Sequence, residues 1–207
     1  LRVAVESSQV VFIAVGTPSH DDGGADLSHV LQAAEQLVRY VDSYKVVAIR
    51  STVPAGSVDL VRTVLRRHMK EGIDFDIAVN PEFLREGKGL HDFFNPTRIV
   101  IGSCSQKAVA ILRELYEPII SGAFSERDGG RGALAAEPVP VIETDPASAQ
   151  MIKYTSNAFL ATRISFINEI AAICEEVGAD IKEVVGGVGY DPRIGHAYLD
   201  AGLGFGG

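Results

Sequence analysis

The stretch SQVVFIAVGTPS, residues 8–19, carries the pattern that decides the fold. Residues 8–15 are dominated by Val, Ile and other apolar side chains, which is typical of a β-strand buried on both faces. Gly16, Thr17, Pro18 and Ser19 follow at once. A buried strand that ends in a short polar loop begins a strand–helix unit of an α/β domain. In such domains ligands bind beyond the carboxyl ends of the strands.

The same alternation continues through the first two-thirds of the chain. Further strands are predicted at residues 45–50, 75–79, 97–102 and 140–144, and amphipathic helices at residues 25–41, 57–69 and 105–119. Asp26 is available to cap the first of these helices. Strands that alternate with helices predict a doubly wound, mainly parallel, Rossmann-like sheet. We assign this α/β domain to residues 1–143.

The pattern changes at Asp145. From there to Val177 the sequence shows no strand signal and no helix break. Asp145 suits a helix N-cap, Pro146 a first turn and Gly178 a C-terminal stop. The apolar residues of this long helix cover more than one face, so we expect it to bridge two domains or to pack against a second chain.

A second domain follows from this helix. Residues 180–189 predict the next helix, so residues 144–207 are interpreted as a long interdomain helix and the start of an all-α dimerisation domain. The Gly- and charge-rich segment 121–138 is predicted to be a flexible surface insertion.

The composition excludes several classes of function. The chain has 207 residues, 46% of them hydrophobic, and a net charge of -8. An acidic chain lacks the basic face that binding to nucleic acid or to an anionic membrane requires. Its longest apolar runs are too short to span a bilayer. Two cysteines without metal-ligand spacing, Cys104 and Cys174, predict a cytoplasmic protein without a metal site, in which both thiols are buried and structural.

Three consecutive strands end in polar loops. Residues 16–19 follow the first, Ser51 and Thr52 the second, and the segment NPEFLREG, residues 80–87, the third. If this last segment is helical, Glu82 and Glu86 share a face and can divide acid and base work. The alternatives to a ligand site are a plain connecting loop for residues 16–19, helix capping for Ser51 and Thr52, and a solvated helix start for residues 80–87.

Two further polar features lie beyond the α/β domain. Lys153 and Asn157 are spaced i, i+4 on the long helix, so they project side by side and can stabilise an oxyanion. Arg193, in the turn DPRIG, suits a phosphate or carboxylate. The alternatives are that Lys153 and Asn157 form a solvent-exposed polar stripe on the helix and that Arg193 is an ordinary surface arginine. Together with the strand ends, these residues predict a two-substrate cleft between an α/β domain and a helical domain.

The last six residues, GLGFGG at 202–207, have the spelling G-x-G-x-x-G. A dinucleotide fingerprint must follow a strand and open a helix, and this segment does neither. We therefore interpret its glycines as permitting a close approach of the backbone to a ligand.

Six segments together resemble one enzyme family. They are VFIAVGTPS, STVPAGS, NPEFLREG, RIVIG, MIKYTSNAFLATRISFINEIA and DPRIGHAYLDAGLGFGG. The chain resembles the UDP-glucose and GDP-mannose dehydrogenase family of nucleotide-sugar dehydrogenases. The resemblance implies two successive NAD-dependent oxidations at C6 of a nucleotide sugar, from alcohol to carboxylate, through a thioester on a cysteine. It favours UDP-glucose, with UDP-N-acetylmannosamine and GDP-mannose open, and implies a homodimer formed through the long helix.

The resemblance also assigns roles to individual residues. The NAD site would comprise Val15, Gly16, Thr17, Pro18, Ser19, Ser51, Thr52, Val53 and Glu86. Catalysis would fall to Glu82, Lys153, Asn157 and Thr52. The substrate would contact Glu82, Phe83, Leu84, Arg85, Glu86, Lys153, Asn157, Arg193, Leu203, Gly204, Phe205 and Gly206.

The resemblance further implies that the chain is an internal fragment. The family's glycine fingerprint would precede Leu1 by roughly 80 residues, and its nucleophilic cysteine would follow Gly207. We therefore expect these residues alone to be inactive. Two other interpretations are open: a two-electron β-hydroxyacid dehydrogenase, which also has a Lys–Asn pair on a long helix, and a non-catalytic dimerisation module.

Overall fold

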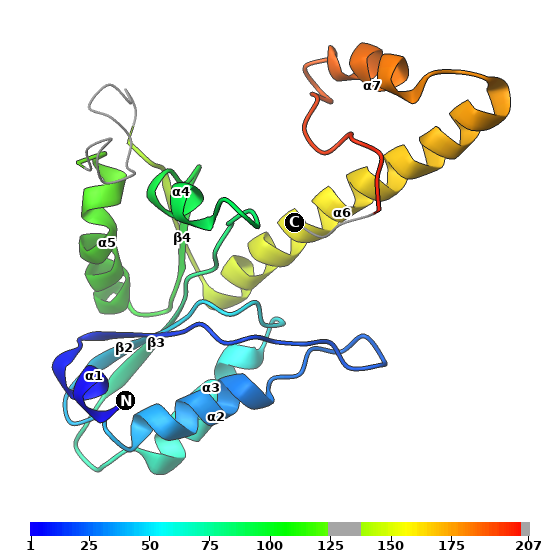
Figure 1. The fold of residues 1–207 in the computed structure, drawn as a ribbon. Coiled ribbons are helices and arrows are strands. Elements are labelled where there is room, and N and C mark those ends of the chain that lie inside the picture. Colours follow the sequence, from blue (N-terminus) through cyan, green and yellow to red (C-terminus); the bar gives the residue numbers. More distant parts are fainter. Residues whose placement is uncertain (124–137, 204–207) are drawn as a thin grey trace. The chain divides into compact units, whose positions relative to one another are not determined.

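The computed structural model describes residues 1–123 and 138–203, and its elements alternate between strands and helices (Figure 1). In chain order they are α1 (Arg2–Ser7), β1 (Val10–Ile13), α2 (Ser28–Val38), β2 (Lys45–Ile49), α3 (Ser57–His68), β3 (Phe75–Val79), α4 (Gly89–Phe94), β4 (Ile99–Gly102), α5 (Gln106–Ile120), β5 (Val141–Thr144), α6 (Pro146–Val177) and α7 (Ile181–Gly189). Every predicted strand and helix is present. The short helices α1 and α4 were not predicted, and most of the predicted insertion, residues 124–137, lies outside the described residues.

The five strands form one sheet in the order β1-β2-β3-β4-β5. β1, β2 and β3 pair in parallel, as do β4 and β5. The prediction of a mainly parallel sheet is therefore confirmed, with one antiparallel step at the pair Val79↔Gly102 between β3 and β4. Because β4 runs against β3, the connection between them, residues 80–98, stays at the edge of the sheet where β1, β2 and β3 end.

Helices cover both faces of this sheet (Figure 1). Successive side chains of a strand point to opposite faces. Val47 and Ile49 of β2 accordingly pack in a cluster with residues of α2 and α3. Val46 and Ala48 pack in a second cluster with residues of α5. This division explains why β2 is buried along its whole length, and it confirms the doubly wound architecture.

The first strand differs from the prediction. β1 was expected to be buried on both faces, but in the structure Ile13 is its only buried residue and Phe12 is 36% exposed. Within the described residues β1 pairs only with β2, at one end of the strand order.

The long helix begins and ends as the sequence predicted. The Asp145 carboxylate accepts hydrogen bonds from the backbone N–H and the hydroxyl of Ser148, at 2.9 and 2.6 Å. Gly178, just beyond Val177, has a positive φ of 74°, which glycine adopts readily. By its internal contacts the chain divides inside this helix, into a unit Leu1–Lys153 and a unit Tyr154–Gly207.

The two cysteines differ in exposure. Cys174 is buried, as predicted, but Cys104 is exposed, so the prediction of two buried thiols is wrong for Cys104. Cys104 lies in the connection from β4 to α5, one residue beyond the buried Ser103. Of the helices in residues 1–123 and 138–203, none has the length and apolarity to cross a membrane.

Close packing of α6 on β4 provides a test of this architecture. A Cβ atom at Gly102 would overlap the Cβ of Ala149 and lie 2.9 Å from the carbonyl oxygen of Asp145. We predict that Gly102→Ala lowers the free energy of unfolding by about 1–3 kcal/mol, because overpacking forces the helix away from the strand. Chemical denaturation of the protein measures this loss.

Gly186 in α7 is the matched control. It has space for a Cβ and no positive φ. Alanine also has the higher helix propensity. Gly186→Ala should therefore leave stability unchanged or raise it slightly. An equal loss in both variants would contradict the packing of Ala149 against β4.

Candidate functional site

The loops that follow β1 and β2 are joined by hydrogen bonds. The Ser51 hydroxyl accepts from the backbone N–H of Val15 at 2.8 Å and donates to the Val15 carbonyl at 2.7 Å. The Thr17 hydroxyl donates to the Thr52 carbonyl at 2.8 Å. These hydrogen bonds hold the two predicted NAD-contacting segments side by side, although Val15 and Ser51 are 36 residues apart in sequence and Thr17 and Thr52 are 35 apart.

This surface has groups that suit one side of a dinucleotide. Val53 is 2% exposed and packs in the core, while Gly16 is exposed and a Cβ atom added to it would meet nothing within 4 Å. The half-buried Thr17 and Thr52 offer hydroxyl and peptide groups beside them. An apolar base with polar groups at its rim is the usual lining of a cofactor site. The residues present therefore fit the adjoining part of an NAD molecule.

The strongest feature of the site is an ion pair between Glu82 and Lys153. Lys153 Nζ donates to Glu82 Oε1 at 2.9 Å, and the Lys153 side chain is only 8% exposed. Glu82 Oε2 accepts from the backbone N–H of Leu84 at 2.7 Å. Both carboxylate oxygens are therefore engaged. Two predicted catalytic residues, 71 positions apart in sequence, meet in the unit Leu1–Lys153.

The surroundings of Glu82 keep its carboxyl group ionised. Partial burial alone raises its pKa, but the Leu84 N–H, the Lys153 ammonium and the more distant Arg50 guanidinium together outweigh burial. The pKa of Glu82 therefore lies below its ordinary value. Glu82 is a carboxylate at neutral pH, the form that can accept a proton.

The carboxylates of Glu82 and Glu86 do not lie on one face of a helix. Residues 81–85 have no regular secondary structure, and Glu86 lies in an exposed turn. The premise that Glu82 and Glu86 lie on one helix is therefore wrong. Because the backbone N–H of Leu84 bonds to the Glu82 side chain, it supports a local turn in place of a helical one.

Two cations lie near one aromatic ring beside this ion pair. The Phe83 ring centroid is 3.8 Å from the Arg98 guanidinium carbon and 5.4 Å from Lys153 Nζ. Cations over an aromatic face are attracted by its quadrupole. Phe83 is thereby held next to Glu82, and Arg98 adds a further positive charge near the ends of the strands.

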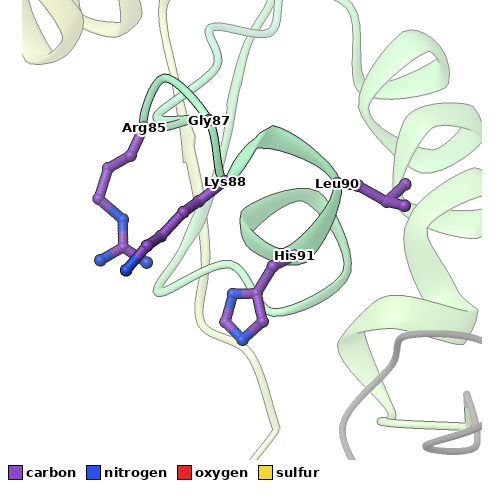
Figure 2. Close-up of a pocket in the computed structure, with 5 residues that line it drawn as sticks. All are labelled: Arg85, Gly87, Lys88, Leu90 and His91. Carbon is purple, nitrogen blue, oxygen red and sulfur yellow. The ribbon is translucent and has the colours of Figure 1, made fainter.

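The loop that carries Arg85 borders a cavity of about 360 Å³ (Figure 2). The side chains of Arg85 and Lys88 extend on the same side of this loop, while Leu90 points away from them. Arg85 donates from Nε and Nη2 to the Asp92 carboxylate, at 2.9 and 2.6 Å. These hydrogen bonds hold the pKa of Asp92 well below its usual range. Asp92 therefore fixes Arg85 and offsets its charge.

Three polar residues near the ion pair were not assigned from the sequence. Gln150 is 2% exposed, and its amide nitrogen and oxygen have no hydrogen-bond partner within the described residues. Its place three residues before Lys153 puts both on one face of α6, a spacing that could have identified it. Arg50 directly precedes the segment STVPAGS and the buried Asn80 begins the segment NPEFLREG, but only their tertiary contacts reveal them.

The unit Tyr154–Gly207 contains the remaining predicted residues. Asn157 is half-buried on α6, one turn beyond Lys153. Arg193 is exposed and pairs with Asp191 at 2.6 Å. Gly202 donates its backbone N–H to Asn168 at 2.9 Å, and Leu203 is fully exposed. The predicted substrate residues Gly204, Phe205 and Gly206 lie outside the described residues.

Comparison with known proteins identifies the family. Residues 1–120 match the NAD binding domain of the UDP-glucose/GDP-mannose dehydrogenase family, and residues 147–207 match the central domain of that family. The chain belongs to the UDP-glucose/GDP-mannose dehydrogenase family. The resemblance in sequence is thus confirmed, and NAD is confirmed as the cofactor of the first domain.

Individual relatives agree with this assignment. The chain is 48% identical over 204 residues to UDP-glucose 6-dehydrogenase TuaD of Bacillus subtilis strain 168, covering 99% of the chain and 40% of TuaD. A UDP-glucose dehydrogenase from Pyrobaculum islandicum has a TM-score of 0.86 and 40% identity, covering all of the chain and 44% of that structure. GDP-mannose dehydrogenase from Pseudomonas aeruginosa has a TM-score of 0.77 and 31% identity, covering all of the chain and 45% of that structure.

The chain therefore spans about two-fifths of the length of its relatives. Both matching family models describe nucleotide-sugar dehydrogenases, which disfavours the alternative of a β-hydroxyacid dehydrogenase. The roles of single residues stay predictions.

The Glu82–Lys153 pair gives a pH-dependent prediction. A carboxyl group whose pKa is lowered by folding stabilises the folded state above its unfolded pKa, and this contribution is lost as the pH falls through the folded value. We predict that Glu82→Gln costs roughly 1–3 kcal/mol of unfolding free energy at neutral pH, because it leaves a buried lysine without its counter-ion. The cost should shrink below the ordinary carboxyl pKa, as measured by denaturation at a series of pH values.

Glu143 is the matched control, because its ion pair with Arg113 is exposed on both sides. Glu143→Gln should cost well under 1 kcal/mol at every pH. If Glu82→Gln also cost well under 1 kcal/mol at every pH, the Glu82–Lys153 pair would not contribute to the stability of the fold.

Proposed function

We propose that the whole protein containing this chain oxidises the C6 alcohol of UDP-glucose to the carboxylate of UDP-glucuronate, in two NAD-dependent steps. The observation that carries the proposal is the Lys153–Glu82 ion pair at the strand ends, beside the loops expected to contact NAD. Family membership and the names of the relatives support it. UDP-N-acetylmannosamine and GDP-mannose are the alternative substrates, since the family's relatives include dehydrogenases named for each.

The first oxidation needs positive charge near the substrate oxygen. Bound NAD would supply the hydride acceptor. The C6 hydroxyl first gives its proton to water, which Thr52 is expected to hold, so that negative charge develops on the oxygen. Hydride then leaves C6 as the C=O bond forms. The Lys153 ammonium stabilises this charge, and the amide of Asn157, one turn further along α6, donates to the same oxygen. Electrostatic stabilisation of this kind is commonly the largest contribution to catalysis.

The second oxidation needs a base. In the thioester route, the aldehyde is captured by the cysteine that the resemblance places beyond Gly207, and a second hydride transfer gives a thioester. Water held by Thr52 attacks the thioester carbonyl and gives its proton to Glu82, and the cysteine leaves as a thiolate. The lowered pKa of Glu82 keeps it in the form that accepts this proton.

The remaining predicted residues bind the two ligands. Residues 15–19 and 51–53 would contact NAD, with Glu86 on the nicotinamide side. Phe83, Leu84 and Arg85 would lie along the sugar nucleotide. Arg193 and the segment 203–206 would complete the substrate site.

This function predicts the behaviour of two variants of the whole protein. Lys153→Ala should lower kcat for NADH formation with UDP-glucose by about 10²- to 10⁴-fold, through loss of charge stabilisation. Glu82→Gln should stop after formation of the thioester, because hydrolysis lacks its base. Steady-state kinetics and mass spectrometry of the trapped acyl-enzyme measure the two effects.

A substrate panel and a control complete this test. Glu143→Gln, which breaks an ion pair between α5 and β5, should leave kcat unchanged. UDP-glucose should give a higher kcat/KM than UDP-N-acetylmannosamine and GDP-mannose. Full activity in Lys153→Ala would favour the alternative of a non-catalytic module.

We also propose a homodimer formed through α6. Phe159, Phe166 and Ile173 are 60%, 58% and 56% exposed and stand seven residues apart. Seven residues are close to two helical turns, so these side chains form one apolar line along the helix. Val177, 71% exposed, extends the line by one further turn. Contiguous exposed apolar surface of this kind marks a protein interface.

Phe166→Glu tests this interface. A charge at the centre of the line should convert the dimer to a monomer at micromolar concentration, because a buried carboxylate without a partner is costly. Light scattering coupled to size-exclusion chromatography measures the mass. Leu60 on α3 is 51% exposed and is the control, since Leu60→Glu makes a similar change away from α6. Loss of the dimer in both variants, or in neither, would refute the interface.

A further inference from the structure

Arg50 is an arginine without a carboxylate partner in the part of the chain that the structure describes. It follows β2 at once and is half-buried. Its Nη1 donates to Asn80 Oδ1 at 3.0 Å and to the Tyr116 hydroxyl at 3.2 Å, both neutral acceptors. Among the ion pairs of residues 1–123 and 138–203, none contains Arg50. The guanidinium thus lies at the end of β2 without a carboxylate partner among these residues, at the edge of the sheet where the candidate site lies.

A buried network fixes the position of this charge. Asn80 is 1% exposed, and its Oδ1 also accepts from the Tyr116 hydroxyl at 2.6 Å. Its Nδ2 donates to the Val100 carbonyl at 2.8 Å, and its backbone N–H to the Ile49 carbonyl at 2.9 Å. Burial raises the pKa of Tyr116, and Arg50 opposes this only in part. Tyr116 is therefore a phenol that donates to Asn80 and accepts from Arg50.

The same network begins the loop that carries Glu82. Asn80 stands two residues before Glu82, so the contacts that fix Arg50 also fix the start of this loop. Glu82 meets Lys153 from α6 and the Leu84 N–H from its own loop. Arg98 lies over the neighbouring Phe83 ring. Arg50 supplies a further cation from the end of β2, and of the groups that lower the pKa of Glu82 it contributes least, after the Leu84 N–H and Lys153.

We propose that Arg50 is a positioning residue for Glu82: held by Asn80 and Tyr116, its guanidinium anchors the start of the loop that carries Glu82 and keeps a fixed cation at that edge of the sheet during catalysis. This inference rests on the proposed role of Glu82 as the base. Lys153 would be drawn towards the developing negative charge of the substrate during hydride transfer. A second, fixed cation would then maintain Glu82 as a carboxylate until water attacks.

The test compares three variants of the whole protein. Arg50→Gln removes the charge and keeps hydrogen-bonding groups, Arg50→Lys keeps the charge, and Tyr116→Phe removes one hydroxyl from the network. Arg50→Gln should move the acid limb of the kcat/KM–pH profile for UDP-glucose to higher pH by roughly 0.5 to 1 pH unit. Arg50→Lys should restore most of the wild-type profile. Tyr116→Phe should give a smaller shift in the same direction.

A readout independent of activity separates this inference from the proposed function. The carboxyl carbon-13 resonance of Glu82, assigned by its loss in Glu82→Gln, reports the pKa of this group directly. Arg50→Gln should raise that pKa, and Arg50→Lys should not. If Glu82→Gln leaves turnover and the acid limb intact, the proposed role of Glu82 fails, whatever Arg50 does.

Other outcomes overturn the inference about Arg50 alone. A lower melting temperature in Arg50→Gln, with an unchanged Glu82 titration and an unchanged acid limb, would make Arg50 a purely structural residue. If Arg50→Gln does not fold, the Glu82 titrations of Arg50→Lys and Tyr116→Phe test the proposal in its place. A wild-type Glu82 titration in Tyr116→Phe, together with a shifted one in Arg50→Lys, would contradict the proposal.

Discussion

The ion pair of Lys153 with Glu82 is the interaction on which the candidate site depends. A lysine side chain that is 8% exposed needs a counter-ion, because an isolated buried ammonium would lose its proton or destabilise the fold. Glu82 supplies that counter-ion and is itself held by the Leu84 N–H. Since each partner fixes the other, the base and the cation expected for the chemistry are already aligned before any ligand binds.

The topology of the sheet makes this pair possible. β1, β2 and β3 run in parallel and end at one edge, and the antiparallel β4 keeps residues 80–98 at that same edge. α6 packs its first turns against Gly102 at the end of β4, where a side chain would not fit. The small residue thereby determines how closely the helix that carries Lys153 approaches the sheet.

The sequence predicted the elements well, because each depends on local patterns. Val- and Ile-rich runs, amphipathic spacing, and Asp145 and Gly178 at the ends of α6 are all visible without tertiary information. The errors lie where tertiary surroundings decide: the partial exposure of β1, the exposure of Cys104 and the irregular backbone around Glu82. The Arg50–Asn80–Tyr116 network joins residues 30 and 66 positions apart, and no spacing in the sequence indicates that they meet.

The division of the chain separates two kinds of site residue. Glu82, Lys153 and the network around Arg50 all belong to the unit Leu1–Lys153. Asn157, Arg193 and Leu203 belong to the unit Tyr154–Gly207, although only one helical turn separates Lys153 from Asn157. The charged groups of the expected acid–base chemistry therefore lie within the unit that contains the NAD-binding domain. The residues expected to bind the sugar nucleotide are divided between the units: Phe83, Leu84 and Arg85 lie in the first, and Asn157, Arg193 and Leu203 in the second. Substitutions in the second unit can therefore change substrate preference while the charged pair in the first stays the same.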